Sequence, residues 1–214
     1  MKRLFLCSSF ADVANLLPVF AAEELKGKIV AFIPTASIPE EVDFYVADGK
    51  SALKAMGMVV NELEFTRYGK EEAAAALRSA DYIYITGGNT FFLLQELKRN
   101  GLDAVIAESI RSGKPYIGES AGAIIMAPST EYMKTVNFDP IGEAPELKEF
   151  SALGTVDFYP VPHYKEFPFA EKADEIIRLY DSVLNLYPIT NKQALFVENS
   201  TVRIVTGIAG TESI

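Results

Sequence analysis

Residues 114–126 read KPYIGESAGAIIM, and the change of pattern inside this stretch decides the fold class. An apolar, β-rich run ends at Ser120, which stands between Gly118 and Gly122, and a helical run follows at once. A strand that passes into a helix through so sharp a turn is typical of an open parallel sheet, in which ligands bind beyond the carboxyl ends of the strands. We therefore expect Ser120 at the functional edge of a sheet.

The chain around this stretch alternates apolar runs with helical periodicity. The expected strands cover residues 3–9, 28–36, 59–65, 81–89 and 114–120, and the expected helices cover residues 11–25, 40–57, 70–80, 90–101 and 102–113. The strands are apolar on both faces, which suits a parallel sheet covered by helices. Pro18 is expected to kink or break the first helix. The sequence predicts an α/β fold with three α/β/α layers and a mostly parallel central sheet.

The second half of the chain has a less regular pattern. We expect a long loop over residues 128–155, a strand over 157–164 that returns to the sheet, a helix over 169–184 and a hairpin over 193–205. The hairpin is expected to turn at Asn199 and Ser200. No repeat or linker divides the sequence, and its 214 residues with 49% hydrophobic content suit one domain over residues 1–214.

Composition narrows the class of protein. Lys and Arg number 20 against 29 Asp and Glu, and no basic run exceeds a pair, so we expect no nucleic-acid partner. The single cysteine, Cys7, excludes an intrachain disulfide and fits a reducing compartment. No run reaches about eighteen apolar residues, so we expect no membrane span. We predict a cytoplasmic protein that is a monomer or a homodimer.

The serine in GESAG has two possible roles. G-x-S-x-G is the pattern of a nucleophile elbow, in which glycines permit a strained turn that lifts the hydroxyl out of the sheet. The same turn would place the amide of Ala121 at a helix N-terminus, where it can face an oxyanion. The alternative is that Ser120 only caps the helix.

Gly87 and Gly88 also stand at a strand end and precede a helix. Two glycines permit close approach of the backbone to a ligand, so their amides can supply a second oxyanion donor. We expect Asn89 and Thr90, which follow them, to bind the substrate. The alternatives are a phosphate-binding turn and a tight turn capped by Thr90, and the chain has no P-loop motif.

His163 is the one histidine of the chain and lies in YPVPHY, where two prolines stiffen the backbone. A serine nucleophile needs a base that titrates near neutrality, and histidine is the usual choice. If Ser120 uses a histidine, it must be His163; the alternative is a structural or surface histidine. The chain has no histidine cluster and no CxxC, so no metal or organic cofactor is implied.

The segments GGNTFFLL, GESAGA and PHY, in this order, resemble the peptidase E family of serine dipeptidases, and the resemblance covers most of the chain. It implies the class I glutamine-amidotransferase-like α/β fold and a hydrolase that releases N-terminal aspartate from dipeptides. By position it implies Ser120 as the nucleophile and His163 as the base. It also implies the amides of Gly88 and Ala121 as oxyanion donors.

The third catalytic residue is expected to be an acid. Peptidase E-like proteins carry an aspartate between the elbow and the histidine, in a stretch like N-D-x-P. The comparable stretch here is NFDP, residues 137–140, with the acid shifted by one position, so Asp139 is the first candidate. The alternatives are Glu131, in the same region, and Glu198, which corresponds to a glutamate that the related cyanophycinases place after the histidine.

The resemblance implies that substrate choice depends on a basic residue. Aspartate-specific members share a G-E-T-R segment after the histidine, whose arginine binds the substrate carboxylate. Residues 169–172 here are FAEK, so Lys172 can supply the charge without the bidentate fork of arginine, unless it is a solvated residue of a helix face. We therefore predict a serine peptidase for small peptides with weakened or altered aspartate preference. The alternatives are an esterase and a catalytically impaired binding protein of the same fold.

Overall fold

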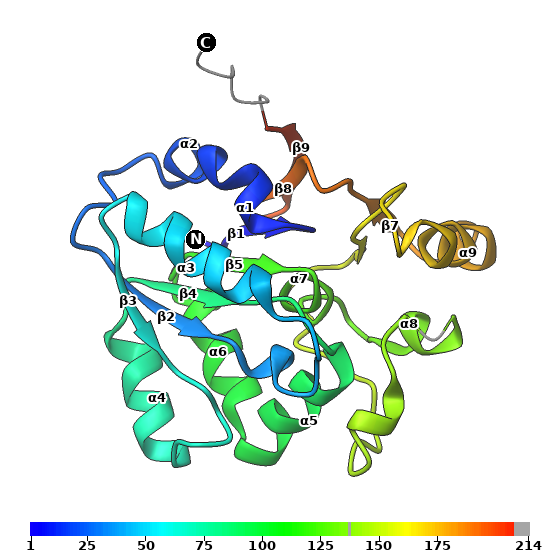
Figure 1. Cartoon of the computed structure of the whole chain (residues 1–214), viewed down its shortest axis with the longest axis horizontal. Coiled ribbons are helices and arrows are strands. Elements are labelled where there is room, and N and C mark those ends of the chain that lie inside the picture. The colour runs from blue at the N-terminus through cyan, green and yellow to red at the C-terminus, as the bar shows by residue number, and fades with distance from the viewer. Residues whose placement is uncertain (137, 208–214) are drawn as a thin grey trace.

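Seven strands form the central sheet of this computed structural model, which describes residues 1–136 and 138–207 (Figure 1). Their spatial order is β3 (Val59–Glu62), β2 (Ile29–Ile33), β4 (Tyr82–Ile85), β5 (Tyr116–Glu119), β1 (Arg3–Cys7), β8 (Gln193–Glu198) and β9 (Thr201–Thr206). The first five strands are parallel, whereas β8 is antiparallel to both β1 and β9. The carboxyl ends of β1, β4 and β5 therefore meet at one edge of the sheet.

Helices cover both faces of this sheet, above and below it in Figure 1. One face carries α1 (Phe10–Val13), η1 (Ala14–Leu16), α2 (Leu17–Ala21) and α3 (Phe44–Ala55), and the other carries α4 (Lys70–Ser79), α5 (Thr90–Asn100) and α6 (Leu102–Arg111). Pro18 stands in the first turn of α2, where its missing N–H costs no helical hydrogen bond. The predicted three-layer architecture is confirmed, and the first helix is broken near Pro18 as expected.

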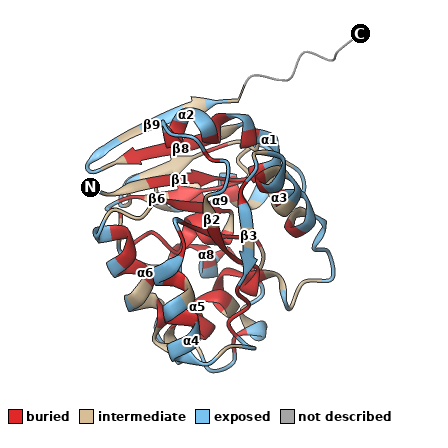
Figure 2. Ribbon diagram, turned by 90° about the vertical axis from the view of Figure 1, so that its left-hand side faces the viewer, coloured by how far each residue is buried: buried red, intermediate tan, exposed pale blue. Residues whose placement is uncertain are grey.

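Each central strand packs against both helical layers because successive side chains point to opposite faces of a sheet. In β1, Leu4 and Leu6 belong to the core beneath α4, α5 and α6, whereas Phe5 and Cys7 belong to the core beneath α1, α2 and α3. Figure 2 shows the resulting band of buried strands between the two layers. This two-sided burial explains why the strands appear in the sequence as continuous apolar runs.

The segment that carries the histidine does not return to the main sheet, so that expectation is wrong. β6 (Tyr159–Val161) instead pairs with β7 (Leu186–Pro188) in a separate two-stranded parallel sheet. Pro160 and Pro188 lack the N–H that a central strand must donate, which confines these segments to edge positions. The helix between them, α9 (Ala170–Tyr180), confirms the expected late helix.

Short helices interrupt the region expected as a loop. α7 (Ala121–Ile124) begins directly after Ser120, as expected, and α8 (Glu131–Thr135) and η3 (Ile141–Glu143) follow it. The C-terminal hairpin of β8 and β9 is confirmed, and Asn199 adopts a positive φ of 55° at its turn. Within the described ranges, no helix is both long enough and apolar enough to cross a membrane.

Candidate active site

The turn at Ser120 has the strained geometry of a nucleophile elbow. It joins β5 to α7, and Ser120 has φ 45° and ψ −104°. A β-carbon on Gly118 would lie 2.5 Å from the carbonyl oxygen of Gly122, and one on Gly122 would lie 2.4 Å from that of Ile85. The turn therefore requires glycine on both sides of the serine, as the G-x-S-x-G pattern predicts.

The imidazole of His163 lies directly against this serine. Its Nε2 is 2.9 Å from Oγ of Ser120, although the two residues are 43 positions apart and follow strands of different sheets. The amide of His163 donates to Oγ of Ser8 at 3.0 Å, and that hydroxyl donates to the carbonyl of Ile189. The ring also stacks on Phe169, with centroids 4.9 Å apart. These contacts fix both the backbone and the ring plane of the histidine.

An asparagine binds the other ring nitrogen of His163. Nδ1 lies 2.8 Å from Oδ1 of Asn191, a residue that precedes β8. An amide oxygen only accepts hydrogen bonds, so this contact keeps the proton on Nδ1 and leaves Nε2 to accept from Ser120. Asn191 is itself held in place because its backbone N–H donates to Oε1 of Glu166 at 3.3 Å.

Asp139, our first candidate for this position, lies elsewhere. Its Oδ2 accepts from the amide of Thr90 at 2.9 Å, at the first turn of α5. The first amides of a helix have no acceptor within the helix, and a carboxylate there also interacts favourably with the helix dipole. Asp139 therefore stabilises the start of α5, which corrects the expectation that it orients His163. Residue 137, from the same NFDP stretch, lies outside the described residues.

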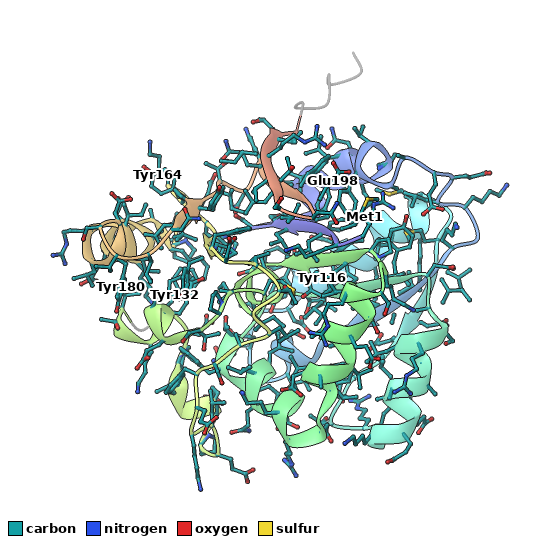
Figure 3. The ribbon with its side chains drawn as sticks, turned by 180° about the vertical axis from the view of Figure 1, so that it is seen from behind. Met1, Tyr116, Tyr132, Tyr164, Tyr180 and Glu198 are labelled. Carbon is teal, nitrogen blue, oxygen red and sulfur yellow. The ribbon has the colours of Figure 1, made fainter. Side chains whose placement is uncertain are left out.

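The alternative acids do not bind the histidine either. Glu198 pairs with Arg203 at 3.3 Å on the terminal hairpin. Figure 3 shows Glu198 close to Met1 and well apart from Tyr164, the residue that follows the histidine. Glu131 is an exposed residue of α8. Among the described residues, neither carboxylate forms a hydrogen bond with the imidazole.

We expected Asn89 and Thr90 to bind the substrate, but both are fully buried. Oδ1 of Asn89 accepts from the amides of Phe91 and Phe92, and its Nδ2 donates to the carbonyl of Pro140 at 2.9 Å. Asn89 is therefore the N-cap of α5 and binds that helix to the neighbouring loop. The expected contact with substrate is corrected, because the hydrogen-bonding atoms of Asn89 face the protein.

The two glycines before α5 lie in close packing, and Gly88 cannot be replaced without a clash. Gly88 has a φ of 125°, and a β-carbon there would lie 2.2 Å from the carbonyl oxygen of Ala36 in η2 (Thr35–Ser37). A β-carbon on Gly87 would lie 3.3 Å from the β-carbon of Ser120. The turn of residues 87–88 therefore packs directly beside the serine.

A pocket of about 620 Å³ opens over Ser120 and His163. Lys172 is the one Lys or Arg among the described residues that line it, and its Nζ donates to the carbonyl of Phe138 at 3.2 Å. Much of the remaining wall is acidic or apolar. It includes the carboxylates of Asp12, Glu40, Glu119 and Asp139 and the exposed apolar side chains of Val42, Phe44 and Phe167.

Comparison with known proteins establishes the family. Residues 4–205 match the sequence model of Peptidase family S51. The chain belongs to peptidase family S51. An uncharacterized peptidase of Pasteurella multocida is 49% identical to this S51 peptidase over 207 residues, which are 97% of this chain and 98% of that protein. Peptidase E of Shewanella amazonensis is 36% identical over 153 residues, 72% of this chain and 61% of that protein.

Solved structures agree with this assignment. The crystal structure of a candidate peptidase E protein from Listeria monocytogenes matches the S51 peptidase with a TM-score of 0.91 and 48% identity, over 96% of this chain and 98% of that one. A peptidase from an acI-B1 actinobacterium matches with a TM-score of 0.67 at 21% identity, over 96% and 88% of the two chains, which supports the fold alone. The S51 protein is a serine-type peptidase of the peptidase E-like group, as the motifs predicted.

Burial shifts the pKa values of two side chains in the active site of the S51 peptidase. It lowers the pKa of His163, while the hydrogen bond with Asn191 and the charge of Glu166 act in the opposite direction. The imidazole is therefore neutral at neutral pH, the form in which Nε2 accepts a proton. Burial also raises the pKa of Asp139, which the nearby charge of Lys172 opposes in part.

Proposed function

We propose that this S51 peptidase cleaves short peptides through Ser120, His163 and Asn191. The observation that carries the proposal is the 2.9 Å contact between Oγ and Nε2 at the strained end of β5. Oγ attacks the scissile carbonyl carbon while Nε2 takes its proton, and the imidazolium then gives that proton to the leaving amine. Water, deprotonated by Nε2, next attacks the acyl-enzyme and releases the acid product and the free serine.

The amides of Gly88 and Ala121 are proposed to bind the oxyanion. Ala121 opens α7, so its amide has no acceptor within that helix. Gly88 lines the pocket beside Gly87, which packs on Ser120. A donor that faces the developing oxyanion contributes about 3 to 4 kcal/mol to transition-state stabilisation.

Asn191 is proposed to orient the imidazole without supplying charge. In a Ser-His-Asp site the carboxylate both orients the ring and stabilises the imidazolium, whereas an amide oxygen can do only the first. Glu166 accepts a hydrogen bond from the backbone N–H of Asn191, and the charge of Glu166 raises the pKa of His163 against the effect of burial. We assign to Glu166 the negative charge that favours the imidazolium in this arrangement.

Asn191→Ala should lower kcat by about a hundredfold or more with little change in KM, because the ring loses the acceptor that fixes its tautomer. Asp139→Asn should cost clearly less, since the amide oxygen can still accept from Thr90. The comparison is made by steady-state kinetics on one dipeptide. Equal losses in the two variants would contradict the assignment of Asn191.

The activity itself is tested with a panel of dipeptides, simple butyrate esters and a fluorophosphonate. A peptidase releases amino acids from the dipeptides and is labelled by the fluorophosphonate, which reacts only with an activated serine. Ester hydrolysis without any peptide hydrolysis would favour the esterase alternative. Absence of labelling and of turnover would favour the binding-protein alternative.

The substrate is proposed to be a short peptide with a free N-terminus, with N-terminal aspartate accepted but not strictly required. Lys172 is the basic side chain that we can assign to the substrate carboxylate, and it lies close to Asp139, which competes for its charge. A lysine also lacks the two parallel hydrogen bonds of an arginine fork. The apolar side chains at the rim favour neutral residues as well.

Lys172→Ala should reduce kcat/KM for Asp-initiated dipeptides by about tenfold, which corresponds to about 1.4 kcal/mol, and leave Leu-initiated dipeptides nearly unchanged. The reason is that a carboxylate desolvated in the pocket loses its paired charge. Asn-initiated dipeptides serve as the isosteric neutral control. A wild type that cleaves only Asp-initiated dipeptides, together with an unaffected Lys172→Ala, would show that another group binds the carboxylate.

A further inference from the structure

Glu119 is a buried carboxylate that the proposed reaction does not use. It precedes the nucleophile, is 3% exposed and lines the active-site pocket. Its Oε1 accepts from the amide of Phe10 at 2.8 Å. Its Oε2 accepts from the hydroxyl of Tyr84 at 2.9 Å and from the amide of Gly87 at 3.5 Å. A buried carboxylate needs such donors, and these three come from different parts of the site.

Two of these donors, Gly87 and Phe10, belong to segments next to the proposed catalytic residues. Gly87 packs on Ser120 and precedes Gly88, the proposed oxyanion donor. Phe10 begins α1, and Ser9 before it makes no side-chain cap, so the carboxylate takes the place of the cap. Two residues earlier in the chain, Ser8 holds the backbone of the histidine. The carboxylate thus links three segments: the turn at Ser120, the turn of residues 87–88 and the segment of residues 8–10, which holds the backbone of His163 through Ser8.

We propose that Glu119 is a positioning residue that holds the turn of residues 87–88 and the start of α1 against Ser120 only while it is ionised. Protonation turns one carboxylate oxygen from an acceptor into a donor. The three donors then compete for fewer acceptors, and the weakest contact, to the amide of Gly87, is lost first. This inference rests on the proposed serine-peptidase function and adds a control of that site by pH.

The surroundings place this protonation near neutrality. Burial raises the pKa of Glu119 to about 7, although its hydrogen bonds from Phe10, Tyr84 and Gly87 lower it. Asp12 on α1 raises it further. Cys7 on β1 and Tyr45 on α3 are the other titratable groups that interact with this carboxylate, and burial raises the pKa of both, so they stay neutral in this range.

The test follows the second-order rate of fluorophosphonate labelling from pH 5 to 9, because this reaction needs no known substrate. Oγ of Ser120 forms a bond to phosphorus, the P–F bond breaks, fluoride leaves, and His163 takes the proton. Glu119→Gln imitates the protonated carboxylate. The second-order rate of labelling of this variant at pH 8 should be lower than that of the wild type by about tenfold or more, because small misplacements of reacting groups have effects of that size or larger.

The decisive measurement is the position of the acid limb, which is the pH range over which the labelling rate falls on the acid side of the profile. The wild-type rate should fall through about pH 7 toward the rate of Glu119→Gln, whose own limb lies lower, where His163 alone is protonated. Tyr84→Phe removes a donor that favours the carboxylate, so its limb should move to higher pH. Glu198→Gln, on the terminal hairpin, should leave the wild-type profile unchanged.

Opposite shifts in the two variants cannot result from general damage to the fold. The proposal would be overturned if Glu119→Gln had a lower labelling rate at high pH but the same acid limb as the wild type. If Glu119→Gln fails to fold, an acid limb of Tyr84→Phe at the wild-type position would overturn it instead. If the wild type itself is neither labelled nor active on peptides, both the positioning role and the proposed function are wrong. If the wild type is active and its limb lacks the ionisation near neutrality, only the positioning role is wrong.

Discussion

Ser120→Ala should abolish fluorophosphonate labelling and reduce dipeptide hydrolysis by about four to six orders of magnitude. The expected loss is this large because the proposed acyl-enzyme forms on Oγ of Ser120, and the remaining groups give only a weak residual rate. The hydroxyl points out of a strained turn at φ 45°, a conformation that a residue other than glycine rarely adopts. Such strain at the edge of a sheet fits a functional demand on that side chain.

Intact-mass and peptide-mass spectrometry of the labelled protein check this prediction. The added mass should lie on the peptide that contains Ser120 and be missing from the variant. Ser79→Ala, an exposed serine at the end of α4, is the matched control and should label as the wild type does. Label that persists in Ser120→Ala would mean that another serine is the nucleophile.

His163→Ala should lower kcat by several orders of magnitude while the protein stays folded. In the proposed reaction the ring is the base, and it contacts Ser120, Asn191 and Phe169. Removal of the ring leaves a cavity of about the size of an imidazole, and Phe169, Asn191 and Ser120 still line it. Free imidazole in the buffer should therefore restore part of the activity of His163→Ala, and should not restore that of Ser120→Ala.

The pH profile of Glu119→Gln gives a second check on the histidine. Burial lowers the pKa of His163, so the neutral base persists to lower pH than an ordinary histidine would allow. The acid limb of that variant should lie below the ordinary histidine range. If His163→Ala remained active without added imidazole and its rate fell over the same acidic pH range as that of the wild type, the base would be another group.

The sequence predicted the main sheet because its strands are buried on both faces. Runs such as residues 81–89 and 114–120 have no polar alternation within their strands, and each run has a glycine near the strand end: Gly87 lies just beyond β4, and Gly118 is the second-last residue of β5. The small sheet of β6 and β7 was not predicted correctly. Its strands contain prolines and are short, so apolar patterning gave no separate signal and could not show which strand they pair with.

The site divides along the same line. Ser120 and His163, which the structure brings into contact, could be named as candidates from a local pattern and from the absence of any other histidine. Asn191 could not, because it lies 28 residues beyond His163 in a loop without a pattern, and tertiary packing alone brings its amide to Nδ1. Asp139 and Asn89 were misjudged for the reverse reason: their positions suggest chemistry, but the amides at the start of α5 use their side chains.

The hydrogen bonds on both sides of the imidazole have a practical consequence for spectroscopy. The chain contains one histidine, so a proton NMR spectrum of the untagged protein in D₂O should hold a single imidazole Cε1–H resonance. The chemical shift of that one line, followed across pH, reports the charge of the group bound to Ser120 and Asn191 without isotopic labelling or assignment. A perturbation of the line by a dipeptide or a phosphonate would register ligand binding at the base itself, even in the Ser120→Ala variant.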